Sequence, residues 1–512
     1  MTSISHAPAA LVGARRSVRA LTAAAVFAVM SVLGLGFSIR LLNPWESWFL
    51  QVVARMRAGD VLYRDISYGA GPLPAYLTEA TTYVVSIDVL AVKLVVVLAF
   101  AATATLAWLI AEHLEIGIGG RLLLLAALAY FAPPLQQPPY APLATAFLLV
   151  ALLAALLSRR AETPAARAVA GVVGGAACAL AFGSKQNVGL YALAALVLTC
   201  VFERRVRAAL WATASFVAGV GCLLLPVWLT GGFKGYLDYG FTGKGAYVHA
   251  QVPFSLSLTG VLDTVTGARS LAGVDAAYWA IGFFLPSLAV GGLVALAFAA
   301  RRGRRLDAVP IVAFAAAGAA SLYPRFDAPH VAYAAPPLVL LLAYALHDWR
   351  ARIPRAIFVG IAAWVALAAL LMATLPIRLA RSPNAELSKL PHLRGAFVQP
   401  DEMARWEQDA ARLVTAAHGD SDGLLLLVPD AGFRYLTTGL QNPTPFDFPF
   451  VTTFGRNGQQ DVVDALASGR IQRVCLAGEW FGLAPERLVS YVRSTMRPGA
   501  ELGMCRLYTH AG

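Results

Sequence analysis

The sequence predicts a polytopic α-helical membrane protein with about 11 transmembrane helices, interfacial helices in the first outer loop and a small C-terminal α/β domain. Of its 512 residues, 58% are hydrophobic and only 14% are charged, and the mean hydropathy is +0.64. Soluble domains contain about 45–50% apolar and about 25% charged residues. Several apolar runs also approach or exceed the roughly 20 residues that a helix needs to cross a bilayer.

The basic residues lie in short clusters between the apolar runs, and these clusters predict the topology. They precede the first span and follow the fourth, sixth, eighth and tenth spans, so the positive-inside rule makes these connections cytoplasmic. The N-terminus is then inside, and the C-terminal domain is periplasmic or extracellular. Topology and anionic lipid headgroups account for the formal net charge of +12, which argues against a nucleic-acid partner.

Three regions follow from this pattern. Residues 1–20 form a short cytoplasmic N-terminus that ends in a basic cluster before an uncleaved first span. Residues 21–377 form the transmembrane domain, with a first outer loop at 43–82. Residues 378–512 form an extracytoplasmic α/β domain, because short helical and strand patterns alternate there.

Each span is delimited by its apolar run. The first is expected at 21–42 and the second at 83–110. The third, 122–131, is short and ends in the proline-rich stretch APPLQQPPYAP, where helices stop. The seventh is expected at 208–229 and the eleventh at 356–375.

The C-terminal region contains a buried strand pattern at 424–429. DVVDALASGR followed by RVCLAG then predicts a helix and a strand, and PERLVSYVRSTMRPG followed by ELGMCRLYTH repeats that order. Cys475 and Cys505 lie on the two later strands and could pair outside the cytoplasm, although the sequence does not give the distance between them. The other cysteines lie in or beside apolar runs and are expected to be small buried hydrophobes: Cys178, Cys200 and Cys222.

The first outer loop is the strongest candidate for a functional site, because it places much charge and aromatic surface against the bilayer. The alternative is a solvated connecting loop. Glu46 lies in the first turn of a predicted helix, where the helix dipole favours a carboxylate. It is either a capping-type acid or a general base at the boundary of water and lipid. An apolar stripe predicts that this helix lies in the membrane interface, with Ser47, Gln51, Arg55 and Arg57 on its other faces: Trp45, Phe49, Val52, Val53 and Met56.

The positive-inside rule predicts few cations at the outer ends of the spans, so a local interaction must explain those that occur there. They either reach the headgroup region along their apolar stems or bind the phosphate of a polyprenyl-phosphate lipid, as Arg does with two hydrogen bonds and Lys as a point charge. Asp327 is close enough in sequence to pair with Arg325. The outer basic residues are Lys185 in GSKQN, Arg325 and His330 in YPRFDAPH, and Lys234, Lys244 and His249 after the seventh span.

No P-loop, GxGxxG, HExxH, CxxC or GxSxG motif occurs in the sequence. The sequence therefore contains none of these motifs that would indicate a nucleotide-driven function or a zinc hydrolase.

The order and sidedness of these features resemble the C-type (GT-C) membrane glycosyltransferase superfamily, specifically the bacterial branch related to protein mannosyltransferases and aminoarabinose transferases. The resemblance covers most of the chain, although each motif is short. An acid directly after the first span is followed by an interfacial helix and AGDVLYRDISYGAGPLPAYL. The other matching stretches are GSKQNVGLYALAALVL, YPRFDAPHVAYAAPPLVLLLAYAL, and a strand ending in Pro-Asp before TGLQNPTPF.

The resemblance implies a multi-pass enzyme of the bacterial cytoplasmic (inner) membrane. Such enzymes transfer a hexosyl or pentosyl group from a polyprenyl-phosphate-sugar to a cell-envelope glycan, lipid or protein outside the cytoplasm, usually with inversion. Some relatives hold a divalent metal near the first-loop acid, so a metal cofactor is possible, but nothing in the spacing of this sequence shows a metal site.

The resemblance also assigns roles to residues. It makes Glu46 the base that deprotonates the acceptor. Many relatives have an Asp, or an Asp-Glu pair, where this chain has Trp45 and Glu46, so Asp65 is the second candidate. It further implies donor-phosphate binding by Arg64, Lys185, Arg325 and His330, and acceptor or sugar binding by Tyr63, Tyr68, Gln186 and Asn187.

Two functions from other classes compete with this interpretation. A transporter or flippase would move a lipid-linked or polar substrate without covalent chemistry, but transporters often show repeated halves and helices broken at the midplane. The sequence has no such repeat, and its unusual charges gather at the outer face, which favours the enzyme. An assembly protein whose exported α/β domain is the working part is the third possibility.

Overall fold

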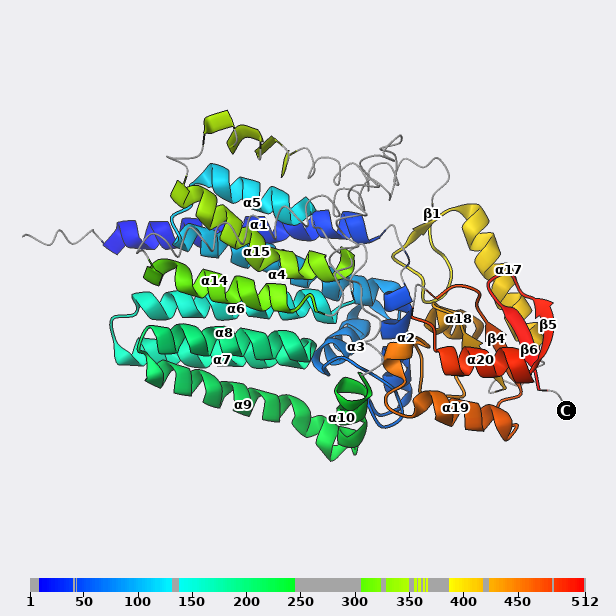
Figure 1. Ribbon diagram of the computed structural model, residues 1–512. Helices are drawn as coiled ribbons and strands as arrows, with labels where there is room; N and C mark the ends of the chain where they lie inside the picture. The colour runs from blue at the N-terminus through cyan, green and yellow to red at the C-terminus, as the bar shows by residue number, and fades with distance from the viewer. Residues whose placement is uncertain are drawn as a thin grey trace, which may run out of the picture.

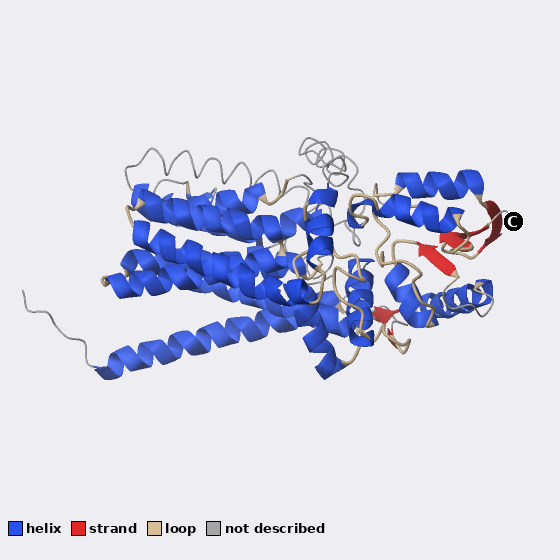
Figure 2. Ribbon diagram, turned by 90° about the horizontal axis from the view of Figure 1, so that it is seen from below, coloured by secondary structure: helices blue, strands red, loops and turns tan. Residues whose placement is uncertain are grey.

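The computed structural model describes residues 9–39, 42, 44–130, 138–244, 305–323, 328–349, most of 354–366, 386–417, 423–480 and 483–510. These residues form a bundle of long helices at one end and a smaller α/β domain at the other (Figures 1 and 2). Helices α2 (Pro44–Ala58), α3 (Leu73–Val85) and α10 (Phe233–Gly240) lie between the two parts.

The bundle confirms a polytopic helical membrane protein. Within the described residues, six helices are long and apolar enough to cross a membrane, and three apolar helices are shorter. They correspond to the first seven, the ninth and the tenth expected spans. The eighth expected span lies outside the described residues, as does most of the eleventh, so the total of 11 stays a prediction. The helices are α1 (Ala9–Ser38), α4 (Val89–His113), α5 (Ile118–Tyr130), α6 (Tyr140–Arg160), α7 (Pro164–Ser184), α8 (Gln186–Phe202), α9 (Val206–Leu229), α14 (Arg305–Ala320) and α15 (Ala328–Trp349).

Small residues set a close helix contact in the described part of the bundle. Gly171 and Gly175 lie one turn apart on α7, facing α9. A Cβ at Gly175 would lie 2.0 Å from the carbonyl oxygen of Ala212. Membrane helices associate by such close approach, since lipid supplies no hydrophobic force between them. The outward faces carry exposed apolar side chains such as Leu198 and Leu210, as expected against lipid.

The second span begins later than expected. Residues 83–85 belong to α3, and α4 starts only at Val89. The two helices are separated at Ser86, whose φ is +65°. Tyr83 and Val84 continue the apolar run, and the prediction passed over Ser86 and Asp88, which cap the two helices at the break.

The described basic residues at the ends of α6 and α8 lie together, at the end of the bundle that is remote from the α/β domain (Figure 1). Arg160 donates to the carbonyl oxygen of His113, at the end of α4, over 2.8 Å. Arg205 donates to the carbonyl oxygens of Ser158 and Arg159 at the end of α6. Connections that were expected on one side of the membrane are therefore neighbours in space.

The C-terminal domain is built on a four-stranded sheet in the order β3-β4-β6-β5. Strands β3 and β4 are parallel, and the other two pairs are antiparallel. The alternation of helices and strands is confirmed, with one correction: residues 497–501 form strand β5 instead of ending a helix. The elements are β1 (Glu386–Leu387), β2 (Phe397–Val398), α17 (Pro400–Ala416), β3 (Leu424–Leu427), α18 (Ala431–Thr438), η3 (Val451–Thr453), α19 (Gly458–Ala467), β4 (Arg473–Leu476), α20 (Glu486–Thr495), β5 (Arg497–Glu501) and β6 (Arg506–Thr509).

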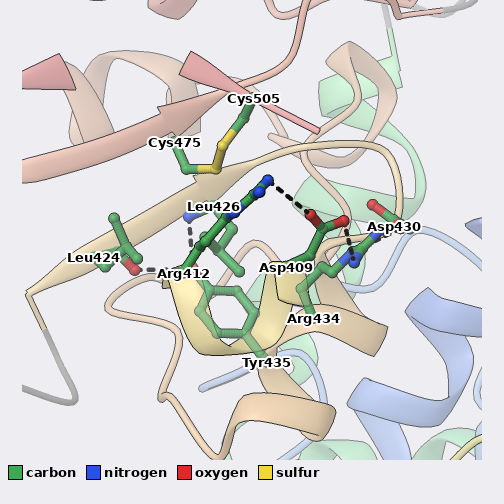
Figure 3. The surroundings of a disulfide bond; sticks show 9 residues. All are labelled: Asp409, Arg412, Leu424, Leu426, Asp430, Arg434, Tyr435, Cys475 and Cys505. Carbon is green, nitrogen blue, oxygen red and sulfur yellow. Dashed lines mark hydrogen bonds and ion pairs between the residues drawn. A yellow bond between two sulfur atoms is a disulfide. The ribbon is translucent and has the colours of Figure 1, made fainter. Parts of the chain in front are cut away.

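A disulfide joins Cys475 on β4 to Cys505 before β6, as the sequence allowed, with their Cα atoms 5.5 Å apart (Figure 3). Beside it, Arg434 pairs with Asp409 and Asp430 and so connects α18 to α17. Of the other cysteines, two are buried as expected, but Cys222 on α9 is exposed. That expectation was wrong because an apolar run does not distinguish a face buried in protein from one that faces lipid.

Cysteine labelling tests the topology. In a chain carrying Cys222→Ser, we expect Ser494→Cys to react with a membrane-impermeant maleimide on intact cells. Glu162→Cys should react only after the inner membrane is permeabilised. Both positions are exposed in the structure, so a lack of access in the folded chain would not explain a difference. Labelling of Glu162→Cys on intact cells would contradict the topology.

Candidate active site

A buried ion pair lies at the junction of the bundle and the first outer loop. Glu46, in the first turn of α2, accepts a hydrogen bond from Lys93, in the second turn of α4, over 2.8 Å between Oε1 and Nζ. The side chain of Lys93 is fully buried and that of Glu46 is 6% exposed. Lys93 also donates to the carbonyl oxygen of Ser38, the last residue of α1, over 2.7 Å. The pair therefore joins α1, α2 and α4.

Lys93 was missed by the sequence analysis. It lies inside the apolar run VLAVKLVVVL, which was assigned to the second span as a whole. A lysine within a span is costly unless it is paired, and it usually marks a functional or structural polar contact. A search for single charges inside apolar runs would have identified it.

The predicted helix over the first outer loop is present, but it is covered by protein on two sides. Phe49, Val52 and Val53 of its apolar stripe are buried. Ser47, expected on another face, is buried as well, and its hydroxyl accepts a hydrogen bond from the amide of Phe433 on α18 over 3.0 Å. Helix α2 thus lies between the bundle and the C-terminal domain.

Aromatic rings cover the start of α2. The ring of Trp45 lies 4.8 Å from that of Phe448 and 6.2 Å from that of Phe450, and Trp48 stacks on Phe448 at 5.1 Å. Both phenylalanines come from the C-terminal domain, in the stretch that follows TGLQNPTPF. Trp45, the residue that stands where many relatives have an acid, is therefore a packing residue next to Glu46.

An ion pair also connects the far end of α2 to the C-terminal domain. Arg55 contacts Asp447 over 3.2 Å and Asp60 over 2.7 Å. Burial raises the pKa of Asp447, while Arg55 and Asn442 oppose that rise. Because Asp447 is fully buried, this contact holds the domain against α2 only as long as Arg55 is present to compensate the charge.

Lys185 and His330 meet on Tyr333. Lys185, between α7 and α8, lies 3.8 Å from the centroid of the Tyr333 ring and donates to its hydroxyl. The ring of His330 lies 5.4 Å from the same ring. Tyr140 extends this cluster towards α2, since its ring is 5.9 Å from Lys185 Nζ and 6.0 Å from the ring of Phe49. The predicted Arg325 lies outside the described residues.

Arg64 and Asp65 are held in a turn of the first outer loop. The carboxylate of Asp65 accepts hydrogen bonds from Arg64 and from the amide of Val61, both over 2.8 Å. These bonds lower the pKa of Asp65 below its ordinary value. Arg64 is about half exposed and reaches towards the carbonyl oxygen of Thr230. Their contacts thus belong to the turn and to the end of α9.

The predicted sugar-binding residues divide into two kinds. The hydroxyl of Tyr63 donates to the carbonyl oxygen of Ala70 over 2.7 Å, and the side-chain oxygen of Asn187 accepts from the amide of Val188. These two side chains therefore support the local backbone. Tyr68 and Gln186 are buried, and burial, with Tyr140 nearby, raises the pKa of Tyr68 well above its ordinary value.

Two of the sequence motifs meet in space. The amide of Gly71, in the first outer loop, donates to the carbonyl oxygen of Ser184 over 3.3 Å. A Cβ at Gly71 would lie only 2.1 Å from the carbonyl oxygen of Gly183. The loop thus packs directly against GSKQN, which carries Lys185.

No metal site is evident in the described part of the chain, where no group of three or more His, Cys, Asp and Glu side chains could hold an ion. Glu46, the acid expected near such a metal, is paired with a lysine. The described donor set therefore does not fit a metal at this acid.

Comparison with solved structures identifies the fold. ArnT from Cupriavidus metallidurans in the apo state matches with a TM-score of 0.56 at 15% identity, over 97% of this chain and 98% of that chain. The same protein bound to undecaprenyl phosphate matches with a TM-score of 0.51 at 14% identity, over 98% of each chain. The arabinofuranosyltransferase AftD from Mycobacteria matches with a TM-score of 0.52 at 16% identity, over 96% of this chain and 40% of that chain.

The chain has the GT-C membrane glycosyltransferase fold. The resemblance deduced from the order of short motifs is thereby confirmed at the level of the fold. No family model and no curated protein matches the chain.

A double-mutant cycle measures the buried ion pair. Lys93→Met leaves the Glu46 carboxylate buried without this cation, and we expect a loss of about 3–5 kcal/mol. The double variant Lys93→Met/Glu46→Gln should recover much of that loss, because no buried charge remains. Thermal unfolding in detergent is the measurement. Additive losses in the double variant would contradict the coupling.

Proposed function

We propose that this protein transfers a sugar from a polyprenyl-phosphate-sugar to a cell-envelope acceptor outside the cytoplasm. The observation that carries the proposal is the position of Glu46. Its carboxylate is held by Lys93 at the end of the bundle that faces the C-terminal domain, with further cations, Lys185 and His330, on the same set of helices. The binding of undecaprenyl phosphate by ArnT, which has the same fold, supports a polyprenyl-phosphate donor.

Glu46 is the general base in this proposal. It is the single acidic residue of α2, and Lys93 fixes the orientation of its carboxylate by binding Oε1. In the transfer step, the acceptor hydroxyl loses its proton to Glu46 while its oxygen bonds to the anomeric carbon. The bond from that carbon to the phosphate oxygen breaks, and the phosphate leaves with the electron pair, which inverts the anomeric centre.

Lys185 is the proposed contact of the departing phosphate. A lysine can stabilise developing phosphate charge as a point charge, and the contact between Gly71 and Ser184 brings GSKQN to the loop that follows α2. His330 and Arg325 are proposed to share this task from YPRFDAPH. Arg64 and Asp65 are secondary candidates, because the contacts that hold them belong to their own turn.

The proposed location is a bacterial cytoplasmic membrane, with the N-terminus inside and the C-terminal domain outside. Basic residues at the ends of α4, α6 and α8 lie together, as the positive-inside rule requires of one membrane face. The disulfide between Cys475 and Cys505 supports an oxidising compartment for the C-terminal domain.

Replacement of the base should abolish transfer. We expect Glu46→Gln to lower turnover by about 10²–10⁴-fold, the usual contribution of a general base. The measurement is release of undecaprenyl phosphate from labelled donors that carry a hexose or a pentose, in the presence of an envelope fraction. The double variant Glu46→Gln/Lys93→Met is the folding control, since it lacks the base but leaves no buried charge. Turnover near the wild-type rate in either variant would reject the assignment.

Removal of the proposed phosphate contact should weaken donor binding. We expect Lys185→Met to lower the affinity for undecaprenyl phosphate by about 10-fold or more, as for a hydrogen bond to a charged group. Lys234→Met is the matched control, because Lys234 is an exposed lysine of α10 on the same side of the protein. An equal effect of the two substitutions on binding to purified protein would mean that Lys185 contributes only general charge.

A further inference from the structure

A cavity of about 280 Å³ lies between α5, α15 and the described residues of the eleventh expected span. One wall comes from the start of α5 and includes Leu123, the second from the later half of α15, and the third from Phe358 and Val365. Helices α5 and α15 pack against each other in the bundle (Figure 1). Of the side chains that line the cavity, only that of His347 is polar, so the cavity is an apolar space with one polar group in its wall.

The cavity lies near the end of the bundle that is remote from the C-terminal domain. His347 belongs to the last turn of α15. The lining residues next to α5 begin at Ile116, three positions after the end of α4 at His113, and the carbonyl oxygen of His113 accepts the hydrogen bond from Arg160. The cavity is therefore on the same side as the basic residues that end α6 and α8, and far from Glu46.

The surroundings of the cavity are suited to lipid. Ile118 and Leu122 on α5 and Val359 beside Phe358 are all more than half exposed, and apolar side chains on the outside of a membrane bundle lie against acyl chains. Water does not fill an apolar space of this kind, since even an engineered apolar cavity of about 150 Å³ stays dry. Hydrocarbon is the occupant that restores the missing van der Waals contacts.

Positive charge is available beside the cavity. Arg355 lies one helical turn before Phe358, and residues three apart share a helix face. Arg355 is exposed, and within the described residues neither it nor His347 makes an ion pair or a side-chain hydrogen bond. Two acids at this end, Glu112 and Asp348, already have partners. A ligand with an apolar chain and a negative head group would complement both the cavity and its charges.

We propose that this cavity binds one acyl chain of an anionic phospholipid, and that Arg355 and His347 bind the phosphate of that lipid. The lipid comes from the membrane leaflet at the basic end of the bundle, which is the cytoplasmic leaflet in the proposed orientation. Basic pockets between transmembrane helices on that side are typical sites for anionic head groups. The inference does not depend on sugar transfer, because the site lies at the opposite end of the bundle from Glu46 and Lys185.

Thermal unfolding of the purified protein in detergent tests the head-group preference. A ligand that binds only the folded state raises the unfolding temperature. We expect phosphatidylglycerol to raise it more than phosphatidylcholine with the same acyl chains, because only phosphatidylglycerol has a net negative charge. Equal rises with the two lipids would overturn recognition of the anionic head group.

A charge variant tests the phosphate contact. Arg355→Gln should weaken binding of phosphatidylglycerol about 5-fold, as for one basic residue near an anionic lipid surface, and leave binding of phosphatidylcholine unchanged. Arg207→Gln is the matched control, because Arg207 is an exposed arginine at the start of α9, at the same end of the bundle. The same loss in both variants would overturn the assignment of Arg355.

Filling the cavity tests the acyl-chain site. Ala343→Phe adds a ring to the α15 wall and should weaken binding of both phospholipids, while the unfolding temperature of the lipid-free protein stays the same or rises because a void is filled. Gly119→Leu is the second variant: a Cβ at this position meets no atom within 4 Å, and leucine favours a helix more than glycine does. Unchanged phosphatidylglycerol binding in both variants would overturn the site.

Undecaprenyl phosphate separates this inference from the proposed function. Its binding should be unchanged in Ala343→Phe and Gly119→Leu, since Lys185 lies at the other end of the bundle. If these variants lose undecaprenyl phosphate but keep phosphatidylglycerol, the cavity holds a polyprenyl chain and the phospholipid site is overturned. If undecaprenyl phosphate does not bind the wild-type protein at all, the proposed function fails, and a preference for phosphatidylglycerol that depends on Arg355 would still support the lipid site.

Discussion

A single charge pair inside the protein, Glu46 with Lys93, determines how the bundle is built at the end that faces the C-terminal domain. Desolvating either ion alone would cost several kcal/mol, so each requires the other. Because Lys93 also binds the end of α1, three helices must arrive together before the charges can be buried. The same requirement fixes where the carboxylate lies, which is the condition for any chemistry that it performs.

The C-terminal domain completes this arrangement from the other side. Its aromatic stretch covers Trp45 and Trp48, while Asp447 binds Arg55 at the opposite end of α2. Helix α2 is therefore held at both ends by the domain and near its start by the bundle. A lone amphipathic helix on a lipid surface would have neither constraint, and its first turn could not hold an acid in one orientation.

The sequence was sufficient to predict features that depend on burial in lipid or exposure to water. It was not sufficient for features that depend on tertiary contacts. Apolar length and basic clusters were enough for the bundle helices, and alternating patterns were enough for most of the C-terminal sheet. They missed the break at Ser86, although Ser86 and Asp88 are capping-type residues between the two helices. Lys93 was hidden by its apolar neighbours. Tyr63 and Tyr68 look equivalent in sequence, and only the hydrogen bond to Ala70 shows that their hydroxyls differ.

The contact of Gly432 with α2 has a consequence for how such proteins can change. A Cβ at this position would lie 2.3 Å from the carbonyl oxygen of Ser47, so the two backbones touch without any intervening side chain. An interface of this kind does not tolerate a larger residue on one side without a compensating change on the other. The C-terminal domain and the loop that it contacts must therefore change together, and exchanging either with that of a distant homologue would disrupt the interface before it altered specificity.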